Sequence, residues 1–364
     1  MFLVSTRNFP PDVGGIQNLI EGLSVALLEH GPVKVFADKF NGHEIYDNNS
    51  KINIERVSGF KIFRKYRKAN LVNDFVKNNN IKGLFFDHWK SIENINEDTL
   101  RNIPSFCLIH SKEINHEQGS HLNKRMVRSA TKAKFIIANS DFTRNLAIKM
   151  GIKNDNIKII HPGCNYPIKI EDEYLKKAEE ITRKFFPILI TIARLDKRKG
   201  HQNILMCIKN LKIKYPRLKY ISIGDGDEKN NLENLKKELG LKDEVLFLNK
   251  INEQFKVALL EKSNLFVMPS VVYKKSVEGF GIAYIEAAQY GVPSLGGKDG
   301  GASDAIEHQK TGLICNGSEL DEVYSSINSM LENNKYLEYG KAAKENSVKF
   351  KWSKIVEEYK KILN

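Results

Sequence analysis

Residues 188–200 read Ile-Leu-Ile-Thr-Ile-Ala-Arg-Leu-Asp-Lys-Arg-Lys-Gly, an apolar run followed directly by a basic loop. A run of this kind is typical of a strand buried on both faces of a parallel sheet. Residues 135–138 have the same apolar character. Ligands of such sheets bind beyond the carboxyl ends of the strands, so the basic loop is expected at a ligand-binding edge.

Similar apolar runs alternate with helical patterns along the whole chain. This alternation predicts βαβ units and an α/β fold with two doubly wound, Rossmann-like domains facing a cleft. Helical patterns lie around residues 16–29, 71–76, 282–290 and 353–363. The predicted strands are residues 2–5, 33–37, 83–86, 105–110, 135–138, 157–161, 188–193, 220–224, 245–248, 265–269 and 313–315.

The charged segment 165–185 lacks strand periodicity and separates the two series of strands. We therefore predict an N-terminal domain over residues 1–168 and a C-terminal domain over residues 169–346. Residues 347–364 are expected to form a helix that packs back on the N-terminal domain. The cleft between two such domains is the expected ligand site.

Composition limits the class of protein. The 364 residues are 41% apolar and 28% charged, which fits a globular protein and excludes a disordered one. The net charge of +13 favours a polyanion, an anionic membrane or a phosphorylated ligand as partner. The four cysteines lie far apart, which argues against a zinc cluster or a disulfide framework and fits a reducing cytoplasm. The chain shows neither a signal-peptide pattern nor an apolar run long enough to span a membrane.

The segment Glu278-Gly-Phe-Gly-Ile-Ala-Tyr-Ile-Glu286 places a small-residue turn before a helix. Free amides from Gly279 to Ala283 would bind a phosphate there, aided by the helix dipole. Glu286 lies about 6–8 Å further along the helix, where a ribose would lie, and Glu278 precedes the helix on the sugar side. The pattern indicates recognition of a nucleotide sugar; the alternative is an amphipathic helix with a surface glutamate at each end.

Other motifs follow predicted strands. Arg194 and Lys199 suit a diphosphate, although a solvated basic loop is the alternative. Gly14 and Gly15 precede the first helix, where backbone amides meet a phosphate or simply form a turn. His110 ends a strand and would face the cleft, although a lone histidine is more often structural.

Two glycine-containing segments complete the set. Gly296-Gly297 and Gly300–Asp304 are expected as a second glycine-rich turn after a short strand, or as a surface loop. Gly224-Asp-Gly226 lacks the last glycine of a dinucleotide-binding motif, which weakens a dehydrogenase interpretation.

A basic run in the first domain has no acidic residue nearby in the sequence. It is expected to contact anionic lipid headgroups or an acceptor, the alternative being a solvated helix face. Its basic residues are Lys61, Arg64, Lys65, Arg67 and Lys68.

Together these motifs resemble glycosyltransferase family 4, whose members are retaining enzymes of the GT-B fold. The resemblance extends over nearly the whole chain, and the pair Glu278 and Glu286 matches the family's E-x7-E pattern. Residues 9–17 and 300–304 look similar to the bacterial phosphatidylinositol mannosyltransferase branch. The remaining matching motifs are Ala138-Asn-Ser140, His161-Pro-Gly163, Thr311-Gly-Leu313 and Trp352-Ser-Lys354.

The resemblance implies a role for each matching residue. Arg194 and Lys199 would stabilise the leaving diphosphate, Glu286 would bind ribose, and His110 would contact the sugar. Gly14 and Gly15 would let their loop approach the diphosphate. The sugar and phosphates would be held by Glu278 and by the amides of Gly279, Phe280, Gly281, Ile282 and Ala283.

The implied reaction is transfer of a hexose from a nucleotide sugar, GDP-mannose or UDP-glucose, to a lipid-linked or phosphorylated acceptor. An α-linked product and no obligatory metal or other cofactor are expected. The expected location is cytoplasmic, peripheral on the inner face of the membrane. Three alternatives stay open: a GT-B epimerase or phosphorylase, a non-catalytic sugar-nucleotide binder, and a nucleic-acid-binding protein. The last has only the net charge in its favour, because aromatic stacking platforms are missing.

Overall fold

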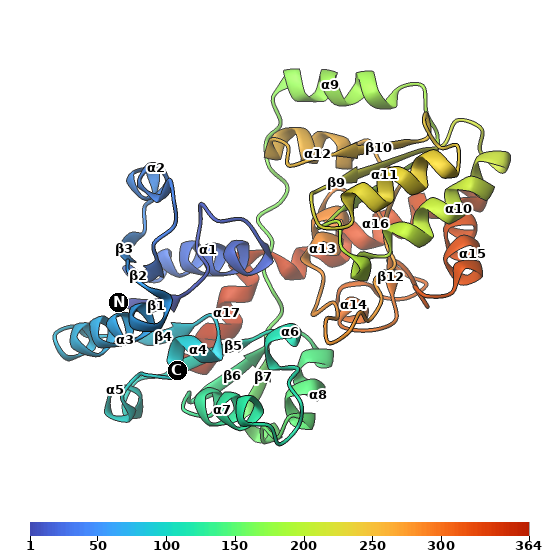
Figure 1. The fold of residues 1–364 in the computed structure, drawn as a ribbon. Coiled ribbons are helices and arrows are strands. Elements are labelled where there is room, and N and C mark those ends of the chain that lie inside the picture. The colour runs from blue at the N-terminus through green and yellow to red at the C-terminus, as the bar shows by residue number, and fades with distance from the viewer. Residues whose placement is uncertain (364) are drawn as a thin grey trace. The chain divides into compact units, whose positions relative to one another are not determined.

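A computed structural model describes residues 1–363, which form two compact units (Figure 1). Unit 1 contains residues 1–164 and the segment that starts at Phe350. Unit 2 is contiguous, from Asn165 to Lys349. The prediction placed the corresponding boundaries at residues 168 and 346. Unit 2 is therefore an insertion in the chain of unit 1.

Unit 1 contains a seven-stranded parallel sheet in the order β3-β2-β1-β4-β5-β6-β7. Strand β1, third in this order, aligns Val4 with Val35 on one side and with Phe85 on the other. The strands are β1 (Phe2–Thr6), β2 (Val33–Asp38), β3 (Asn53–Val57), β4 (Gly83–Phe86), β5 (Ser105–Ile109), β6 (Phe135–Ala138) and β7 (Ile157–Ile159).

Helices cover both faces of this sheet, because successive strand residues point to opposite sides. Leu3 joins a core with α3, α4 and α7, while Val4 joins a core with α1 and α17. The helices of unit 1 are α1 (Gly15–Leu28), α2 (His43–Asn49), α3 (Lys61–Lys77), α4 (Trp89–Ile92), α5 (Glu97–Arg101), α6 (Ser111–Ile114), α7 (His121–Ala130), α8 (Asp141–Lys149), the 3-10 turn η1 (Asn154–Asn156) and α17 (Trp352–Leu363).

The C-terminal helix α17 is part of the core of unit 1, and Figure 1 shows it in red beside α1. The Trp352 indole lies directly over two glycines. A Cβ atom would come within 2.1 Å of the indole at Gly22 and within 2.3 Å at Gly163. Only glycine therefore fits at these two positions beneath the indole.

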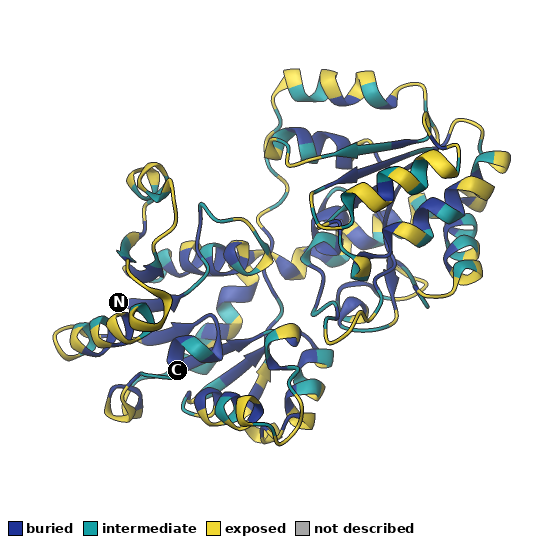
Figure 2. Ribbon diagram, viewed as in Figure 1, coloured by how far each residue is buried: buried dark blue, intermediate teal, exposed yellow. Residues whose placement is uncertain are grey.

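Unit 2 contains a six-stranded parallel sheet in the order β10-β9-β8-β11-β12-β13. Figure 2 shows the strands of both units as largely buried, while the helices expose one side. The strands of unit 2 are β8 (Ile188–Ile192), β9 (Lys219–Ile223), β10 (Val245–Leu248), β11 (Leu265–Met268), β12 (Ser294–Gly297) and β13 (Gly312–Cys315).

Helices α10 and α15 pack on one face of this sheet, around Leu189, Val267 and Leu295. The 3-10 turn η4 (Val348–Phe350) crosses the boundary between the units. The other elements are α9 (Asp172–Thr182), η2 (Lys197–Lys199), α10 (His201–Lys214), α11 (Lys229–Glu238), α12 (Glu253–Glu261), α13 (Ile282–Gln289), α14 (Ala302–Ala305), α15 (Leu320–Leu331), η3 (Glu332–Asn334) and α16 (Lys335–Ser347).

Two strand predictions differ from the structure. Strand β3 was missed because its polar, half-exposed residues hide the apolar pattern of an edge strand. Gly296 and Gly297 were expected in a turn but lie inside the buried strand β12. A Cβ on Gly297 would lie 1.8 Å from the Ser270 carbonyl oxygen, so the strand requires glycine here for close packing.

Candidate functional site

The basic loop of unit 2 follows strand β8 and is held in a fixed shape. The Asp196 side chain caps the η2 turn by accepting a hydrogen bond from the Arg198 amide at 3.1 Å. The turn ends at Gly200, whose φ of 78° is left-handed. A Cβ there would also come within 2.4 Å of the Pro269 carbonyl oxygen, so glycine is required on both grounds.

Three charged side chains meet beside this loop. The Lys199 ammonium contacts Oε2 of Glu278, and Nη1 of Arg198 lies 2.7 Å from the same oxygen. All three side chains are largely buried. Burial alone would raise the pKa of the Glu278 carboxyl, but the two cations outweigh it and lower the pKa to about 2. The Arg198 guanidinium also lies 3.9 Å from Oδ2 of Asp196, so the two cations face two carboxylates at the end of β8.

Glu278 leads into helix α13, whose N-cap is Gly281 with a left-handed φ of 85°. A Cβ on Gly281 would lie 2.4 Å from the Tyr284 ring. The first-turn amides of Ile282 and Ala283 have no acceptor inside the helix, which makes this end suitable for an anion. Among the predicted amide donors, Phe280 has a buried side chain, so only its backbone is available to a ligand.

Glu286 lies one turn further along α13 and is buried. Burial raises the pKa of its carboxyl. Within residues 1–363 no group donates a hydrogen bond to this carboxylate. Neither of its oxygens is among the fully buried atoms that lack a partner, so the carboxylate keeps some contact with solvent and is accessible to the hydroxyl groups of a ligand.

The second glycine-rich turn packs directly on Glu278. The Gly301 amide donates to the Glu278 carbonyl at 2.9 Å. Gly300 has a φ of 106°, and a Cβ there would lie 2.3 Å from the same carbonyl oxygen. This turn therefore fixes the backbone that carries the Glu278 carboxylate.

Arg194 begins the same loop, and its side chain is exposed. Its carbonyl accepts a hydrogen bond from Nε2 of the buried His201 at 3.2 Å. The other ring nitrogen of His201 lies 3.1 Å from the Tyr220 hydroxyl. Burial lowers the pKa of His201 to about 4, so a neutral imidazole holds the backbone of Arg194 while the guanidinium remains available.

In unit 1, Gly14 and Gly15 lie where the loop after β1 enters helix α1. Asp12 organises this loop by accepting hydrogen bonds from the Val13 amide at 2.9 Å and from the Gln17 side chain at 2.6 Å. A Cβ on Gly14 would come within 2.5 Å of the Gln17 side chain. At Gly15 the added atom would meet nothing within 4 Å, so the fold itself does not require glycine there.

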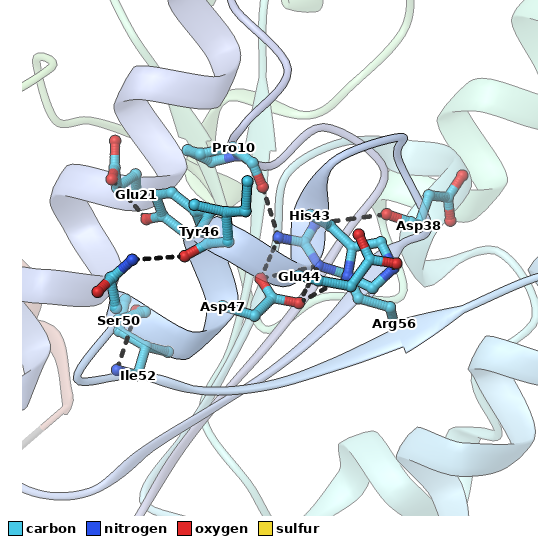
Figure 3. Close-up of polar contacts among 12 residues, drawn as sticks. Pro10, Glu21, Asp38, His43, Glu44, Tyr46, Asp47, Ser50, Ile52 and Arg56 are labelled. Atoms are coloured by element: carbon cyan, nitrogen blue, oxygen red, sulfur yellow. Dashed lines mark hydrogen bonds and ion pairs between the residues drawn. The ribbon is translucent and has the colours of Figure 1, made fainter.

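Arg56 of strand β3 ties this loop to helix α2 (Figure 3). Its guanidinium donates to the Pro10 carbonyl and, through Nε, to Oδ2 of Asp47 at 3.0 Å. The guanidinium carbon lies 5.5 Å from the centroid of the Phe9 ring. Arg56 is thus the main polar anchor of the loop that carries Gly14 and Gly15.

His110 lies directly after β5, as predicted. Its Nε2 atom is buried and makes no hydrogen bond within the described residues 1–363. Its backbone amide donates to Oε1 of Glu113 at 3.2 Å, and Nε2 of His88 lies 3.0 Å from Oε2 of the same carboxyl group. Burial and the nearby Asp87 raise the pKa of Glu113. Glu113 therefore holds the backbone of His110, and the Nε2 atom of the imidazole has no hydrogen-bond partner within residues 1–363.

Asp87, at the end of β4, connects this group to strand β1. Its carboxylate is completely buried and accepts hydrogen bonds from the Thr6 hydroxyl at 2.8 Å, the Arg7 amide at 3.0 Å and the Ser91 hydroxyl at 2.6 Å. The carboxyl ends of β1 and β4 are joined in this way, next to β5, which precedes His110.

The structure contradicts part of the prediction that the basic residues of α3 face a membrane or an acceptor. Lys68 was expected to face a membrane or acceptor but is 3% exposed, and its ammonium binds Asp38 and the Thr6 carbonyl. Arg64 pairs with Asp38 at 3.3 Å, and Lys65 pairs with Glu93 at 3.6 Å. The fold supplies acidic partners that are distant in sequence. Lys61 and Arg67 remain exposed.

Several residues of the two sites were not predicted from the sequence. They are Arg198, Arg56, Asp87, His88 and the positioning role of Glu113. Asp87 and His88 follow an apolar strand directly, which is the same signal that identified His110. Arg198 is flanked by lysines, and no sequence pattern shows which cation faces Glu278.

Comparisons with known proteins identify the class. The model of the Glycosyltransferase Family 4 domain matches residues 13–166, and that of the group 1 glycosyl transferases matches residues 173–347. These matches fall on unit 1 and unit 2 respectively. The protein is a glycosyltransferase.

Relatives and solved structures agree with this class. A GDP-mannose-dependent α-(1-6)-phosphatidylinositol monomannoside mannosyltransferase of Mycolicibacterium smegmatis is 24% identical over 90% of this chain and 88% of its own. A monoacylated-substrate counterpart of Corynebacterium glutamicum is 22% identical over 91% and 88%. The crystal structure of Anabaena HepE with UDP and glucose superposes with a TM-score of 0.80 at 19% identity, over 100% of this chain and 99% of that one. The chain belongs to the family 4 glycosyltransferases and has the GT-B fold.

Proposed function

We propose that this glycosyltransferase is a retaining hexosyltransferase that uses a nucleoside-diphosphate sugar. The observation that carries the proposal is the cluster of Lys199, Arg198 and Glu278 beside the amino end of α13. The cations of this cluster, the exposed guanidinium of Arg194 and the helix amides would together neutralise a diphosphate without a metal. The transfer reaction would accordingly need no obligatory metal ion.

The donor is a GDP- or UDP-linked hexose. GDP-mannose is supported by the names of the actinobacterial relatives, and UDP-glucose by the Anabaena structure determined with that nucleotide sugar. The diphosphate would lie against Arg194, Lys199 and the amides from Gly279 to Ala283. Glu286, which has no donor within residues 1–363, would bind the ribose hydroxyls.

Glu278 would use its two oxygens for different partners. Both protein cations contact Oε2, so Oε1 is the oxygen that is left to accept from a sugar hydroxyl. In unit 1, the buried Nε2 of His110 would face the same sugar, and Gly14 and Gly15 would admit the diphosphate.

In the reaction, the acceptor hydroxyl oxygen bonds to the anomeric carbon on the face from which the diphosphate leaves. The bond from that carbon to the phosphate oxygen breaks, and the departing phosphate oxygen takes the hydroxyl proton. The anomeric configuration is retained, which gives an α-linked product from an α-linked donor. The main contribution of the protein is stabilisation of charge on the leaving group by Arg194, Arg198 and Lys199.

The acceptor is a hydroxyl of a lipid-linked or phosphorylated molecule in glycolipid or cell-envelope glycan synthesis. The phosphatidylinositol-based acceptors in the names of the relatives support this class. The enzyme would act in the cytoplasm, peripherally bound to the inner face of the membrane. No helix within residues 1–363 is long and apolar enough to cross a membrane.

A panel of sugar nucleotides tests the donor. The correct donor should stabilise the protein against heat by about 2.7 kcal/mol at a hundredfold excess over its Kd, and should be hydrolysed slowly without acceptor. Product analysis then separates transfer from epimerisation or phosphorolysis, which would yield an altered sugar or require phosphate. Lack of stabilisation by every nucleotide sugar would refute the proposal.

A further inference from the structure

The amino-terminal end of α3 exposes an unusual group of large apolar side chains. Over seven residues, four of them are in contact with solvent, and Figure 2 shows α3 with exposed residues in yellow. Apolar residues gathered in this way mark an interaction surface, whereas scattered ones need no explanation. Their exposed fractions are 84% for Phe60, 68% for Ile62, 66% for Phe63 and 49% for Tyr66.

The next turn of α3 is firmly attached to the sheet. Lys68 binds the Thr6 carbonyl, at the last residue of β1, and the Asp38 carboxylate, at the last residue of β2. Arg64 contacts Asp38 as well. The first turn therefore projects beyond the carboxyl edge of the sheet, which is the edge that carries His110 and the Gly14–Gly15 loop.

Neighbouring connections add apolar side chains at this edge. Val13 follows β1 and is 61% exposed, and Ile45 follows β2 and is 74% exposed. Strands β1, β2 and β3 are adjacent and parallel, so the segments that follow them leave the sheet side by side.

The charges on this end of α3 are positive. Lys61 and Arg67 are exposed, and Arg67 donates to the Ser58 carbonyl at 2.9 Å. Neither pairs with a carboxylate in the part of the chain that the structure describes. Lys65, Arg64 and Lys68 are already occupied by Glu93 and Asp38. Aromatic and apolar groups combined with unpaired cations are typical of elements that lie in the interface of an anionic bilayer.

We propose that the end of α3 formed by Phe60, Lys61, Ile62, Phe63, Tyr66 and Arg67 inserts into an anionic membrane surface. This inference rests on the proposed function, because a lipid-linked acceptor is reached at such a surface. Binding depends mainly on burial of the apolar side chains, and the two cations select anionic lipid. The basic run as a whole is not the binding element.

Co-sedimentation of the full chain with vesicles of phosphatidylglycerol and phosphatidylcholine tests the inference. The triple variant Phe60→Ser, Ile62→Ser, Phe63→Ser should bind about tenfold or more weakly than the wild type. Raising the salt from about 0.1 to about 0.5 M should weaken wild-type binding by less than about tenfold, since apolar insertion is not screened. The matched control is Ile213→Ser, which removes an 80% exposed apolar side chain of unit 2 and should leave binding unchanged.

Equal vesicle binding by the triple variant and the wild type would overturn the inference. So would a wild-type dimer without vesicles that the triple variant converts to a monomer, because the surface would then belong to a second copy of the chain. Thermal stabilisation by sugar nucleotides is measured on the same samples. Stabilisation without vesicle binding refutes only the membrane inference, and vesicle binding without stabilisation refutes only the proposed function.

Discussion

The guanidinium of Arg198 lies 2.7 Å from the carboxylate of Glu278, although eighty residues separate them in the chain. The parallel sheet of unit 2 makes this contact, since both residues lie beyond the carboxyl ends of neighbouring strands β8 and β11. Lys199 contacts the same oxygen. A diphosphate bound here would meet cations that the Glu278 carboxylate holds in position.

Loss of Lys199 tests its role in the reaction. Lys199→Ala should reduce kcat by about a hundredfold, equivalent to about 3 kcal/mol, because charge on the leaving diphosphate is no longer stabilised. Lys197→Ala is the matched control: Lys197 is the adjacent basic residue, its side chain is 52% exposed, and it does not contact Glu278. Equal turnover by the Lys199→Ala protein and the wild type would contradict the assignment.

The acid stability of the protein should report on Glu278. The pKa of this carboxyl is lowered to about 2 in the folded state, so the ion pairs stabilise the fold above its usual pKa of 4.5. This contribution is lost as pH falls from about 4.5 to about 2. The difference in Tm between the wild type and Glu278→Gln should accordingly shrink over that range. A difference that stays constant between pH 5 and pH 2 would show that the pKa of Glu278 is not lowered.

Two glycines at helix amino ends should respond differently to alanine. Gly281→Ala should lower the free energy of unfolding by about 1–2 kcal/mol, because φ is left-handed and the Tyr284 ring occupies the space. Gly15→Ala meets open space and should leave stability unchanged or slightly higher. If Gly15 admits the diphosphate, the same variant should raise KM for the donor. Chemical denaturation and steady-state kinetics measure both effects.

The role of Glu113 should depend on its oxygen as a hydrogen-bond acceptor more than on a negative charge. Glu113→Ala leaves the His110 amide without its acceptor and should cost about 1–3 kcal/mol of stability as well as activity. Glu113→Gln keeps a carbonyl oxygen in place. Since burial raises the pKa of Glu113, the neutral glutamine should approach wild-type behaviour in both assays. A glutamine variant as impaired as the alanine variant would show that the negative charge is required.

Substitution of the buried Lys68 should destabilise the protein more than substitution of the exposed Lys61. Lys68→Met leaves Asp38 short of a partner and should destabilise unit 1 by about 3 kcal/mol. Lys61→Met, at the exposed end of the same helix, should change stability by less than about 0.5 kcal/mol. Urea denaturation of the two variants measures the contrast, and similar losses would contradict the burial of Lys68.

The sequence predicts most of the fold because the central strands are apolar at nearly every position. Residues 135–138 and 245–248 form strands with the predicted bounds. Edge strand β3 lies outside this rule, since Asn53, Glu55 and Arg56 make it polar. The glycines of β12 were interpreted as a turn because the close approach of Ser270 that requires them is a tertiary contact.

The sequence identifies those site residues whose positions follow from short-range spacing along the chain. Glu278, Gly281 and Lys199 are identified by spacing around one turn or one strand end. Whether a cation is free or paired depends on partners elsewhere in the chain. Asp38 lies thirty residues before Lys68 and neutralises it, which no local pattern shows. For the same reason the apolar end of α3 was less evident from the sequence than the basic residues around it.

The insertion of unit 2 into the chain of unit 1 has a consequence for biosynthesis. Unit 2 is continuous and is able to fold as soon as its last residue, Lys349, has left the ribosome. The core of unit 1 lacks Trp352, Val356 and Tyr359 until the whole of unit 2 has been translated. The first-made half of the protein is therefore the last to reach its native core, and until then Gly22 and Gly163 face an empty indole site. A chaperone that shields apolar surface would be needed by the nascent amino-terminal half for longer than by the half that follows it.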